Sequence, residues 1–526
     1  MESGSQLYGV LNKAWKSTCR IVLGDEVGEL KDFEGWLKEG YPAVQMKKSH
    51  VSGKGVMLWE NRYCDKARFV SEEEVKEEKM DPLTINEIKD IDSLIQAVSE
   101  KWEYAGNRVQ GNSSFVENSD IIIDSQYVAD STNILNSEYV HSTFMVRRGS
   151  KYIFGSGGFG EGEFVMKSVD CYNIKRVFGS YFAVDSSDIF MSFNCAGCME
   201  NMFTFSQKNK RHCIGNIELP KDKYSEIKEK LLAEIRDELK AKKRFPSLAE
   251  LVRPGKPKAG KPDVGEDTER TDIRPIEKAF ASTYKIILKK EPRGGMDDYA
   301  GWLLGNVPKM LEIETVFGTT TYLPDDPAFK FFAKTPKERM VKFFEAMELG
   351  KLKMDESDIK SIEKMKEGLS KIAFFTMELV SGTAKNAIKS PVVYYSSNLY
   401  RMYDGTYSEY AGVGLFSLNS KYVFGCYRIM ESQFCLKCYN SIGMARCLEV
   451  NTSSKCQDAL YCCNCEGLSE AMFCFNAKGK RHAIGNAELE ADKYRKIRDS
   501  LVEQIADKLE KDRDFKWDIY NIGCAK

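Results

Sequence analysis

The sequence predicts an α+β protein formed by tandem duplication. Each half is expected to contain a mixed or helical flank, a parallel β-solenoid of six-residue repeats and a C-terminal capping helix. Three observations predict this class: 526 residues carry the same motifs twice in one order, small residues recur every six positions, and a proline-rich segment separates the copies. The expected segments are a mixed α/β flank (1–111), solenoid (112–216), capping helix (217–245), linker (246–274), second flank (275–390), second solenoid (391–486) and capping helix with tail (487–526).

The duplication is visible in motifs that recur at a nearly constant spacing. KRHCIGN at 210–216 recurs 270 positions later as KRHAIGN, and KYIFG at 151–155 recurs at the same spacing as KYVFG. Nearer the start, AWKST at 14–18 matches AFAST at 279–283, and DFEGWL at 32–37 matches DYAGWL at 298–303. Since the order of motifs is unchanged, both halves are expected to share one plan.

A six-residue period runs through both predicted solenoids. Serines fall at 113, 119, 125, 131 and 137, which defines a serine slot, and an aliphatic residue follows each after three positions. After one slip the pattern resumes at Ser150, and the second half repeats it from Ser396 to Cys474. This period fits the stacked turns of a hexapeptide β-helix better than a helix or a β-sandwich. Serines twelve residues apart, from Ser396 to Ser432, favour two faces per turn over a triangular coil of eighteen residues.

The flanks carry helix signals. Thr335-Pro336-Lys337-Glu338 combines an N-cap, a first-turn proline and a capping-box glutamate, and predicts a helix through Met347. Charged helices near 221–242 and 491–512 follow the two solenoids, where they are expected to cover open strand edges.

Composition narrows the function classes. Lys+Arg 77 against Asp+Glu 78 gives a net charge of −1, so charge does not indicate nucleic-acid binding. The sequence shows neither a secretory signal nor a long apolar run, which predicts a cytoplasmic protein without membrane association. Sixteen cysteines in such a chain are expected to be reduced thiols.

Several cysteine groups imitate metal-ligand spacing, and those considered are Cys195, Cys198, Cys462, Cys463 and Cys465. A plainer interpretation follows from the repeat, since two inner slots three residues apart produce C-x-x-C whenever both hold cysteine. Buried thiols are compact, nearly apolar fillers. The preferred prediction is therefore no metal and no cofactor, with zinc or an iron–sulfur cluster as the alternative.

The duplicated segment that ends each solenoid supplies a second candidate site, made of Arg211, His212, Asn216, Arg481, His482 and Asn486. Its glycine and asparagine suit a structural turn, whereas its arginine and histidine could bind an anion or a partner. No phosphate loop, nucleophile elbow or zinc-protease motif occurs, so no catalytic residue is predicted.

Aromatic residues form the third candidate. They occupy an outer slot, two residues after the serine slot, and comprise Tyr127, Tyr139, Tyr152, Tyr410, Phe416, Tyr422 and Phe434. Such a ladder can bind a protein surface, a glycan or single-stranded bases. The alternative is packing beneath the chain's own helical flank.

With the repeats and the closing NKRHCIGN segment at 209–216 in view, the chain resembles a little-characterised class of Cys- and Tyr-rich solenoid proteins of candidate-phylum bacteria and some archaea. The resemblance covers the repeats and the trailing helices, about half the chain. That class has no established activity, and its members usually carry a denser cysteine ladder and a preceding zinc ribbon, which the first half lacks.

These observations favour a non-catalytic intracellular scaffold that binds a macromolecular partner, most of all a protein, through its solenoid faces. One alternative is a metal or Fe–S cofactor-assembly scaffold similar to the β-helical proteins of sulfur mobilisation. Another is a hexapeptide-repeat-like transferase in which His212 or His482 acts as the base.

Overall fold

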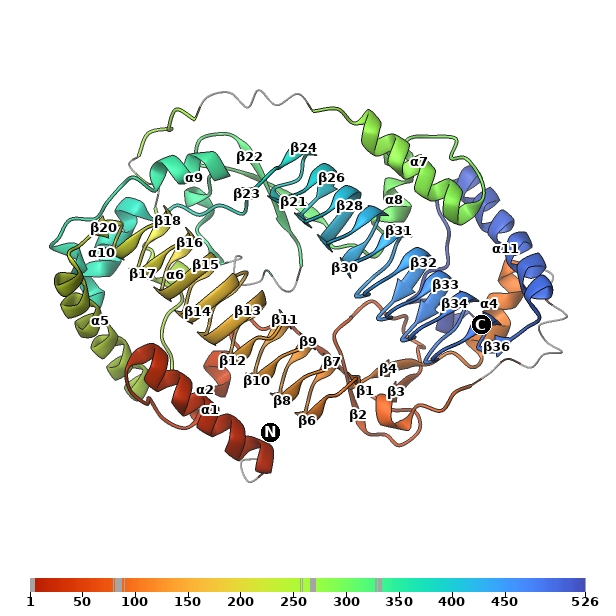
Figure 1. Cartoon of the computed structure of the whole chain (residues 1–526), viewed down its shortest axis with the longest axis horizontal. Helices are drawn as coiled ribbons and strands as arrows, with labels where there is room; N and C mark the ends of the chain where they lie inside the picture. The colour runs from red at the N-terminus through yellow and green to blue at the C-terminus, as the bar shows by residue number, and fades with distance from the viewer. Residues whose placement is uncertain are drawn as a thin grey trace.

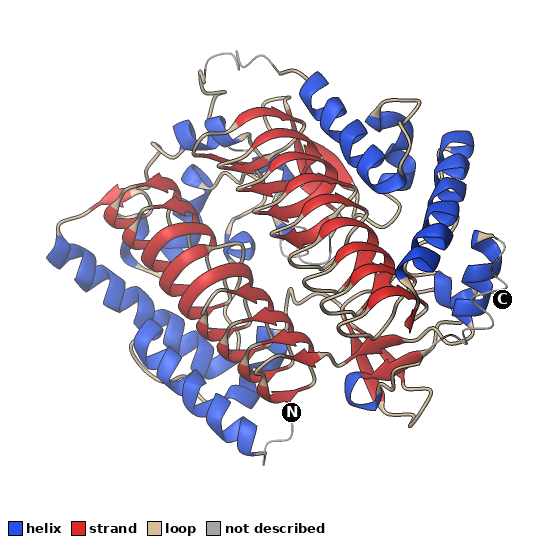
Figure 2. Ribbon diagram, turned by 45° about the vertical axis from the view of Figure 1, so that its right-hand side comes forward, coloured by secondary structure: helices blue, strands red, loops and turns tan. Residues whose placement is uncertain are grey.

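A computed structural model describes residues 5–78, 80, 88, 90–255, 257, 259–264, 271–326, 329 and 334–525. The chain is α+β, as predicted, and its strands form two large sheets, one in each half, in which nearly all neighbours are parallel. The two stacks of strands lie side by side with helices along their outer sides (Figures 1 and 2).

The first half, residues 1–245, begins with two helices, a small hairpin and a third helix, and then forms the first stack of strands. Its elements are α1 (Gln6–Leu23), α2 (Leu30–Leu37), β1 (Gln45–Lys48), β2 (Gly55–Leu58), β3 (Phe69–Ser71), α4 (Ile91–Ser99), the strands from β4 (Tyr104–Gly106) to β20 (Ile217–Glu218), and α5 (Lys221–Lys242).

The second half repeats this order. Its elements are α7 (Arg274–Leu288), α8 (Ala300–Leu303), β21 (Met310–Glu314), β22 (Thr320–Pro324), α9 (Phe343–Leu349), α10 (Ile362–Ile372), the strands from β23 (Leu379–Ser381) to β36 (Ala487–Glu488), and α11 (Ala491–Asp512). Two expectations need correction. The expected linker contains a short helix, α6 (Leu248–Leu251), and the helix expected from Pro336 starts only at Phe343, because Met340 forms a β-bridge with Phe375 instead.

Most strand partners in the two large sheets lie twelve residues apart in sequence, and a few lie thirteen apart, as Glu138 and Lys151 do. Val140 in β10 (Glu138–His141) pairs with Val128 in β8 (Gln126–Ala129), and Ala411 in β28 (Glu409–Leu418) pairs with Val423 in β29 (Lys421–Phe424). Intervening strands such as β9 (Thr132–Leu135) pair among themselves. Each turn of the chain therefore contributes two strands, one to each of two faces, and an offset of eighteen residues does not occur in these pairings.

Positive φ at every third residue accompanies this geometry. In the turns it falls on Asp130 (φ 49°) and Asn136 (φ 48°), residue types that tolerate the left-handed region. Inside the strands it falls on the outer slot, for example on Tyr127 (φ 54°). An aromatic residue is disfavoured there by about 1–2 kcal/mol, so the parallel hydrogen bonds on either side must hold it in place.

Serine suits the serine slot because of its hydroxyl group as well as its small size. Ser131 Oγ donates to Ala129 O at 2.7 Å and accepts from the amide of Thr143, twelve residues later, at 3.1 Å. The amide of Ser131 in turn donates to Ser119 Oγ at 3.1 Å. A column of hydroxyls thus pairs buried turn amides and carbonyls that the strand ladder leaves free.

Each half closes the end of the other half's stack. Met354 N donates to Gly215 O at 3.0 Å, and Asn216 Nδ2 donates to Gly350 O at 3.2 Å. The reciprocal bonds run from Met80 N to Gly485 O at 2.9 Å and from Asn486 Nδ2 to Glu78 O at 2.7 Å. The trailing helices α5 and α11 run alongside the stacks (Figure 1), so the segment that covers each final turn comes from the opposite half.

One covalent link joins distant segments, because Cys64 and Cys524 form a disulfide across 460 residues with a Cα–Cα distance of 6.4 Å. The expectation that all sixteen cysteines are reduced is therefore wrong for this pair. The other fourteen are free and buried.

Ser131→Ala should lower the free energy of unfolding by about 1–3 kcal/mol, because it leaves the buried amide of Thr143 and the carbonyl of Ala129 without this partner. Urea unfolding of the full chain measures the loss. Ser187→Ala, in the position just after the serine slot, should change it by less than about 0.5 kcal/mol. Equal effects of the two substitutions would contradict this role.

Replacing Cys64 and Cys524 together by serine should cost about 2–4 kcal/mol, because the cross-link restricts the unfolded chain. A reducing agent should lower the melting temperature of the native chain and leave that of the double variant unchanged. A native chain indifferent to reduction would show that the link contributes no stability.

Candidate functional site

Stacked aromatic rings run along one face of the first stack. Neighbouring rings have centroids 4.7–5.1 Å apart and planes within 11° of parallel, in the order Phe115, Tyr127, Tyr139, Tyr152 and Phe164. In the second half, Tyr410, Tyr422 and Phe434 stack with centroid distances of 5.0 and 4.7 Å. Most of these rings are half-buried and Phe115 is exposed, so they pack on the protein and remain partly open to solvent.

Phe416 does not belong to this ladder. It occupies the outer slot by residue count, but it is six residues from Tyr410 and Tyr422, which places it on the opposite face of the same turns. There it stacks on Phe329 with a centroid distance of 5.6 Å and lines a cavity between the halves. A six-residue count alone cannot distinguish the two faces of a twelve-residue turn.

Beyond the aromatic rings, the outer slot of the following turns holds charged residues that form pairs. In the first half, Arg176 forms two hydrogen bonds with Asp188, at 2.7 and 2.6 Å, and His212 Nε2 lies 2.8 Å from Glu200. Each pair spans twelve residues, one turn of the chain.

The second half repeats these pairs at equivalent positions. Arg446 binds Asp458 through two hydrogen bonds of 2.7 Å, and His482 Nε2 lies 2.8 Å from Glu470. Sequence analysis did not identify the glutamate partners of the histidines, although a search twelve residues before each histidine would have found them.

We define the two outer columns as seven consecutive outer-slot residues of each half; at the two levels before them the halves differ, because Phe115 and Tyr127 align with Asn386 and Asn398. The seven residues are Tyr139, Tyr152, Phe164, Arg176, Asp188, Glu200 and His212 in the first half, and Tyr410, Tyr422, Phe434, Arg446, Asp458, Glu470 and His482 in the second. The residue type is identical at all seven levels. The inner residue that follows each one differs at all seven, as in Val165 against Cys435 and Ile189 against Ala459.

The predicted Arg-His-Asn segments divide between two roles. Asn216 and Asn486 are buried and complete the end of each stack, for example through Asn486 Oδ1, which accepts from Phe475 N at 3.0 Å. Arg211 and Arg481 are exposed beside the histidines of the outer columns. The asparagines are therefore structural and the arginines are exposed, whereas the histidine side chains are only 18% and 16% exposed and pack against Tyr224 and Tyr494.

The cysteines considered as ligands are buried. Burial raises the pKa of Cys463 to about 12 and that of Cys465 well above its usual range, which favours neutral thiols at these two positions. A hydrogen bond between the thiols of Cys195 and Cys198 raises the pKa of Cys195 and lowers that of Cys198. Within the described ranges, the single group of three ligand-type side chains with donor atoms within 4.8 Å of one another contains no cysteine. The structure thus does not gather Cys195, Cys198, Cys462, Cys463 and Cys465 into a metal site.

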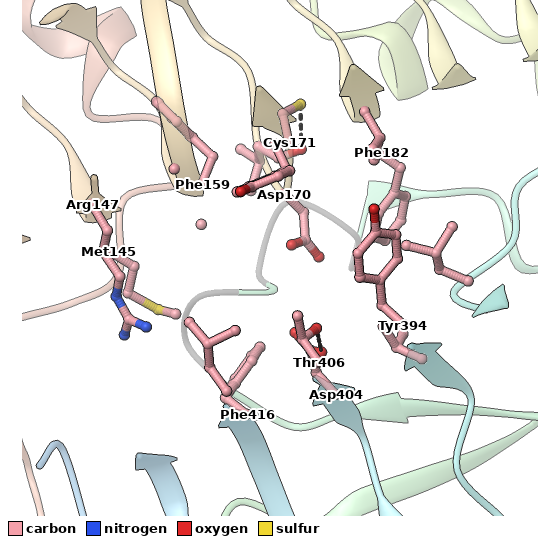
Figure 3. Close-up of a pocket in the computed structure, with 18 of the residues that line it drawn as sticks. Met145, Arg147, Phe159, Asp170, Cys171, Phe182, Tyr394, Asp404, Thr406 and Phe416 are labelled. Carbon is pink, nitrogen blue, oxygen red and sulfur yellow. Dashed lines mark hydrogen bonds between the residues drawn. The ribbon is translucent and has the colours of Figure 1, made fainter. Parts of the chain in front are cut away.

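A cavity of about 190 Å³ lies between the two halves, and its walls are mainly aromatic and aliphatic. Asp170 from the first half and Asp404 from the second point into it, with Arg147 at one side (Figure 3). Thr406 Oγ1 donates to Asp404 at 2.8 Å. No sequence pattern indicated these residues, because only the contact between the halves brings them together.

The cavity makes ionisation of its polar groups costly. Burial raises the pKa of Asp404 to about 6, and burial together with the nearby Asp404 raises that of Asp170 well above its usual range. Burial and the charge of Arg428 lower the pKa of Arg147 to about 10. The two carboxyl groups can hold a proton or accept hydrogen bonds from a donor group between them.

No protein-family model matches this chain, and no curated protein or solved structure shows significant similarity to it. Among the described residues, no helix combines the length and the apolar character needed to cross a membrane.

Asp404→Asn should raise the melting temperature at about pH 8 and have less effect at about pH 4. The folded state holds the carboxyl proton more tightly than the unfolded chain, so the contribution of Asp404 to stability is highest below its unfolded pKa of about 4 and falls as pH rises through about 6. Asp492→Asn, on the exposed surface of α11, should show no such dependence. A pH-independent effect of Asp404→Asn would contradict the raised pKa.

Proposed function

We propose that this chain is a non-catalytic interaction scaffold, a tandem duplication of one β-solenoid unit that binds a protein partner through its two outer columns. One observation carries the proposal: the seven outer residues are the same in both halves, whereas the seven inner residues behind them all differ. Surface positions of a purely structural repeat are free to change faster than its core. Identity of half-buried aromatic and charged residues on the outer side of the stacks is compatible with a contact surface.

The duplication and the solenoid are supported by the common plan of the halves. Element order, the twelve-residue strand offset and the reciprocal closure of the stack ends are the same in both. A duplicated unit presents the same column twice on one rigid body, which suits a partner with two equivalent binding elements.

The chemistry of the columns favours a protein over a nucleic acid. Tyrosine, phenylalanine and arginine are enriched in protein interfaces. The basic groups of the columns are already neutralised by Asp188, Glu200, Asp458 and Glu470, so the columns offer no excess positive charge for a phosphate backbone.

Fewer observations support the two alternatives, a cofactor-assembly scaffold and a transferase. Eight cysteines fill the inside of the second stack and could serve cofactor assembly. Burial raises the pKa of five of them and so opposes the thiolate that iron and zinc require, whereas hydrogen bonds from Cys438 and Cys447 outweigh burial and lower the pKa of Cys435. Iron and sulfide analysis after anaerobic purification tests that alternative. In a transferase, the Glu200–His212 or Glu470–His482 pair would act as an oriented general base. A screen of the chain with acyl and nucleotide donors tests this alternative.

Quantitative affinity capture from cells that make the protein tests the scaffold. Alanine at Tyr152 and Arg176 should weaken retention of the partner, and the same changes together with alanine at Tyr422 and Arg446 should reduce it by about 100-fold or more, because bivalent attachment is lost. Lys230→Ala on α5 is the matched surface control. An unchanged set of captured proteins with the four-site variant would overturn the proposal.

A further inference from the structure

Three ligand-type side chains from separate segments meet where α2 packs on the first stack. They are Glu34 on α2, Asp130 in the turn after β8, and His141 at the end of β10. Their donor atoms all lie within 4.8 Å of one another, with His141 Nε2 3.5 Å from Asp130 Oδ2 and 4.0 Å from Glu34 Oε1. Donor atoms around a zinc ion with bonds of about 2.0–2.2 Å are separated by roughly 3–3.5 Å, so small adjustments suffice.

The imidazole of His141 is fully buried and poised for such a role. Its Nδ1 lies 2.9 Å from Ser142 Oγ, whereas Nε2 has no hydrogen-bond partner and faces the two carboxylates. When Nδ1 carries the proton and donates to Ser142, the lone pair of Nε2 points at negative charge. A cation between the three groups would relieve this repulsion.

Lys38 is one positive charge beside the cluster. Lys38 Nζ lies 3.4 Å from Asp130 Oδ2 on a side chain that is 42% exposed, so it offsets charge from the solvent side and can turn away. The Glu34 side chain is 27% exposed and gives access from solvent.

The second half provides an internal comparison. The strand register places Gly412 opposite Phe424 where His141 lies opposite Phe154, and Arg401 corresponds to Asp130. In the matching helix motif, Ala300 takes the place of Glu34. The same helix–stack junction therefore forms with none of the three donors, which shows that the architecture does not require them.

We propose that Glu34, Asp130 and His141 bind a divalent transition-metal ion, Zn²⁺ or a similar ion, that ties α2 to the first stack. One imidazole with two carboxylates suits Zn²⁺, Mn²⁺ and Fe²⁺. This site is independent of the outer columns and of the inner cysteines.

Metal analysis of the full chain tests the site. After treatment with a chelator and dialysis against Zn²⁺, the native chain should retain one zinc ion that His141→Ala loses and that Glu34→Gln binds at least tenfold more weakly. Asp32→Asn, exposed on the same helix, is the matched control and should retain the metal. Since Glu34 is partly exposed, its variant remains informative even when the loss of His141 impairs folding.

Cobalt separates this site from the cysteines. The Co²⁺-loaded chain should show visible d–d absorption without a thiolate-to-cobalt charge-transfer band, and His141→Ala should abolish that absorption. A charge-transfer band that persists in His141→Ala would place the metal on cysteine and overturn the proposal. A native chain that retains neither Zn²⁺ nor Co²⁺ would also overturn the proposal.

Discussion

A hydrogen bond between a slot hydroxyl and the amide one turn later is the interaction on which the architecture depends. A turn of twelve residues forces the chain to reverse direction twice, and each reversal buries amides and carbonyls that no strand can pair. Serine satisfies both groups with one small side chain, as Ser131 does for Thr143 N and Ala129 O. Cysteine replaces it in much of the second half, where Cys438 N donates to Cys426 Sγ at the longer distance of 3.4 Å.

The same constraint explains why the halves are not independent. A stack of parallel strands ends with unpaired backbone groups, and an exposed strand edge promotes aggregation. Here each half covers the last turn of the other, because the segment around Met354 covers Gly215 and the segment around Met80 covers Gly485. A side chain at either glycine would collide with the covering methionine, whose sulfur would lie 2.6 or 2.3 Å from the added Cβ. Each half is thus completed by the other.

Differences between the halves show where the repeat tolerates change. The inside of the first stack is mainly aliphatic and that of the second is rich in cysteine, yet the inner residues of both stacks are buried. The outer columns do not vary in this way. Among the described residues, the cluster of Glu34, Asp130 and His141 lies in the first half alone, and the disulfide joins Cys64 in the first half to Cys524 in the second, so the two halves differ in these features.

The sequence by itself determined the α+β class, the two-part plan, the six-residue period and the burial of its small residues, because these depend on local alternation along one strand and turn. The repeat also identified the aromatic outer slot. It did not show which face Phe416 lies on, because residues six apart lie on opposite faces of a turn and residues twelve apart lie on the same face. Tertiary structure decided the Glu200–His212 and Glu470–His482 pairs, the closure of each stack by the opposite half, the link from Cys64 to Cys524, and the meeting of Asp170 with Asp404. These contacts join residues one turn or several hundred positions apart, and their geometry depends on how turns stack and how two stacks pack side by side. A periodic pattern records which side of a strand a residue occupies, but it carries no information about which distant surface will face it.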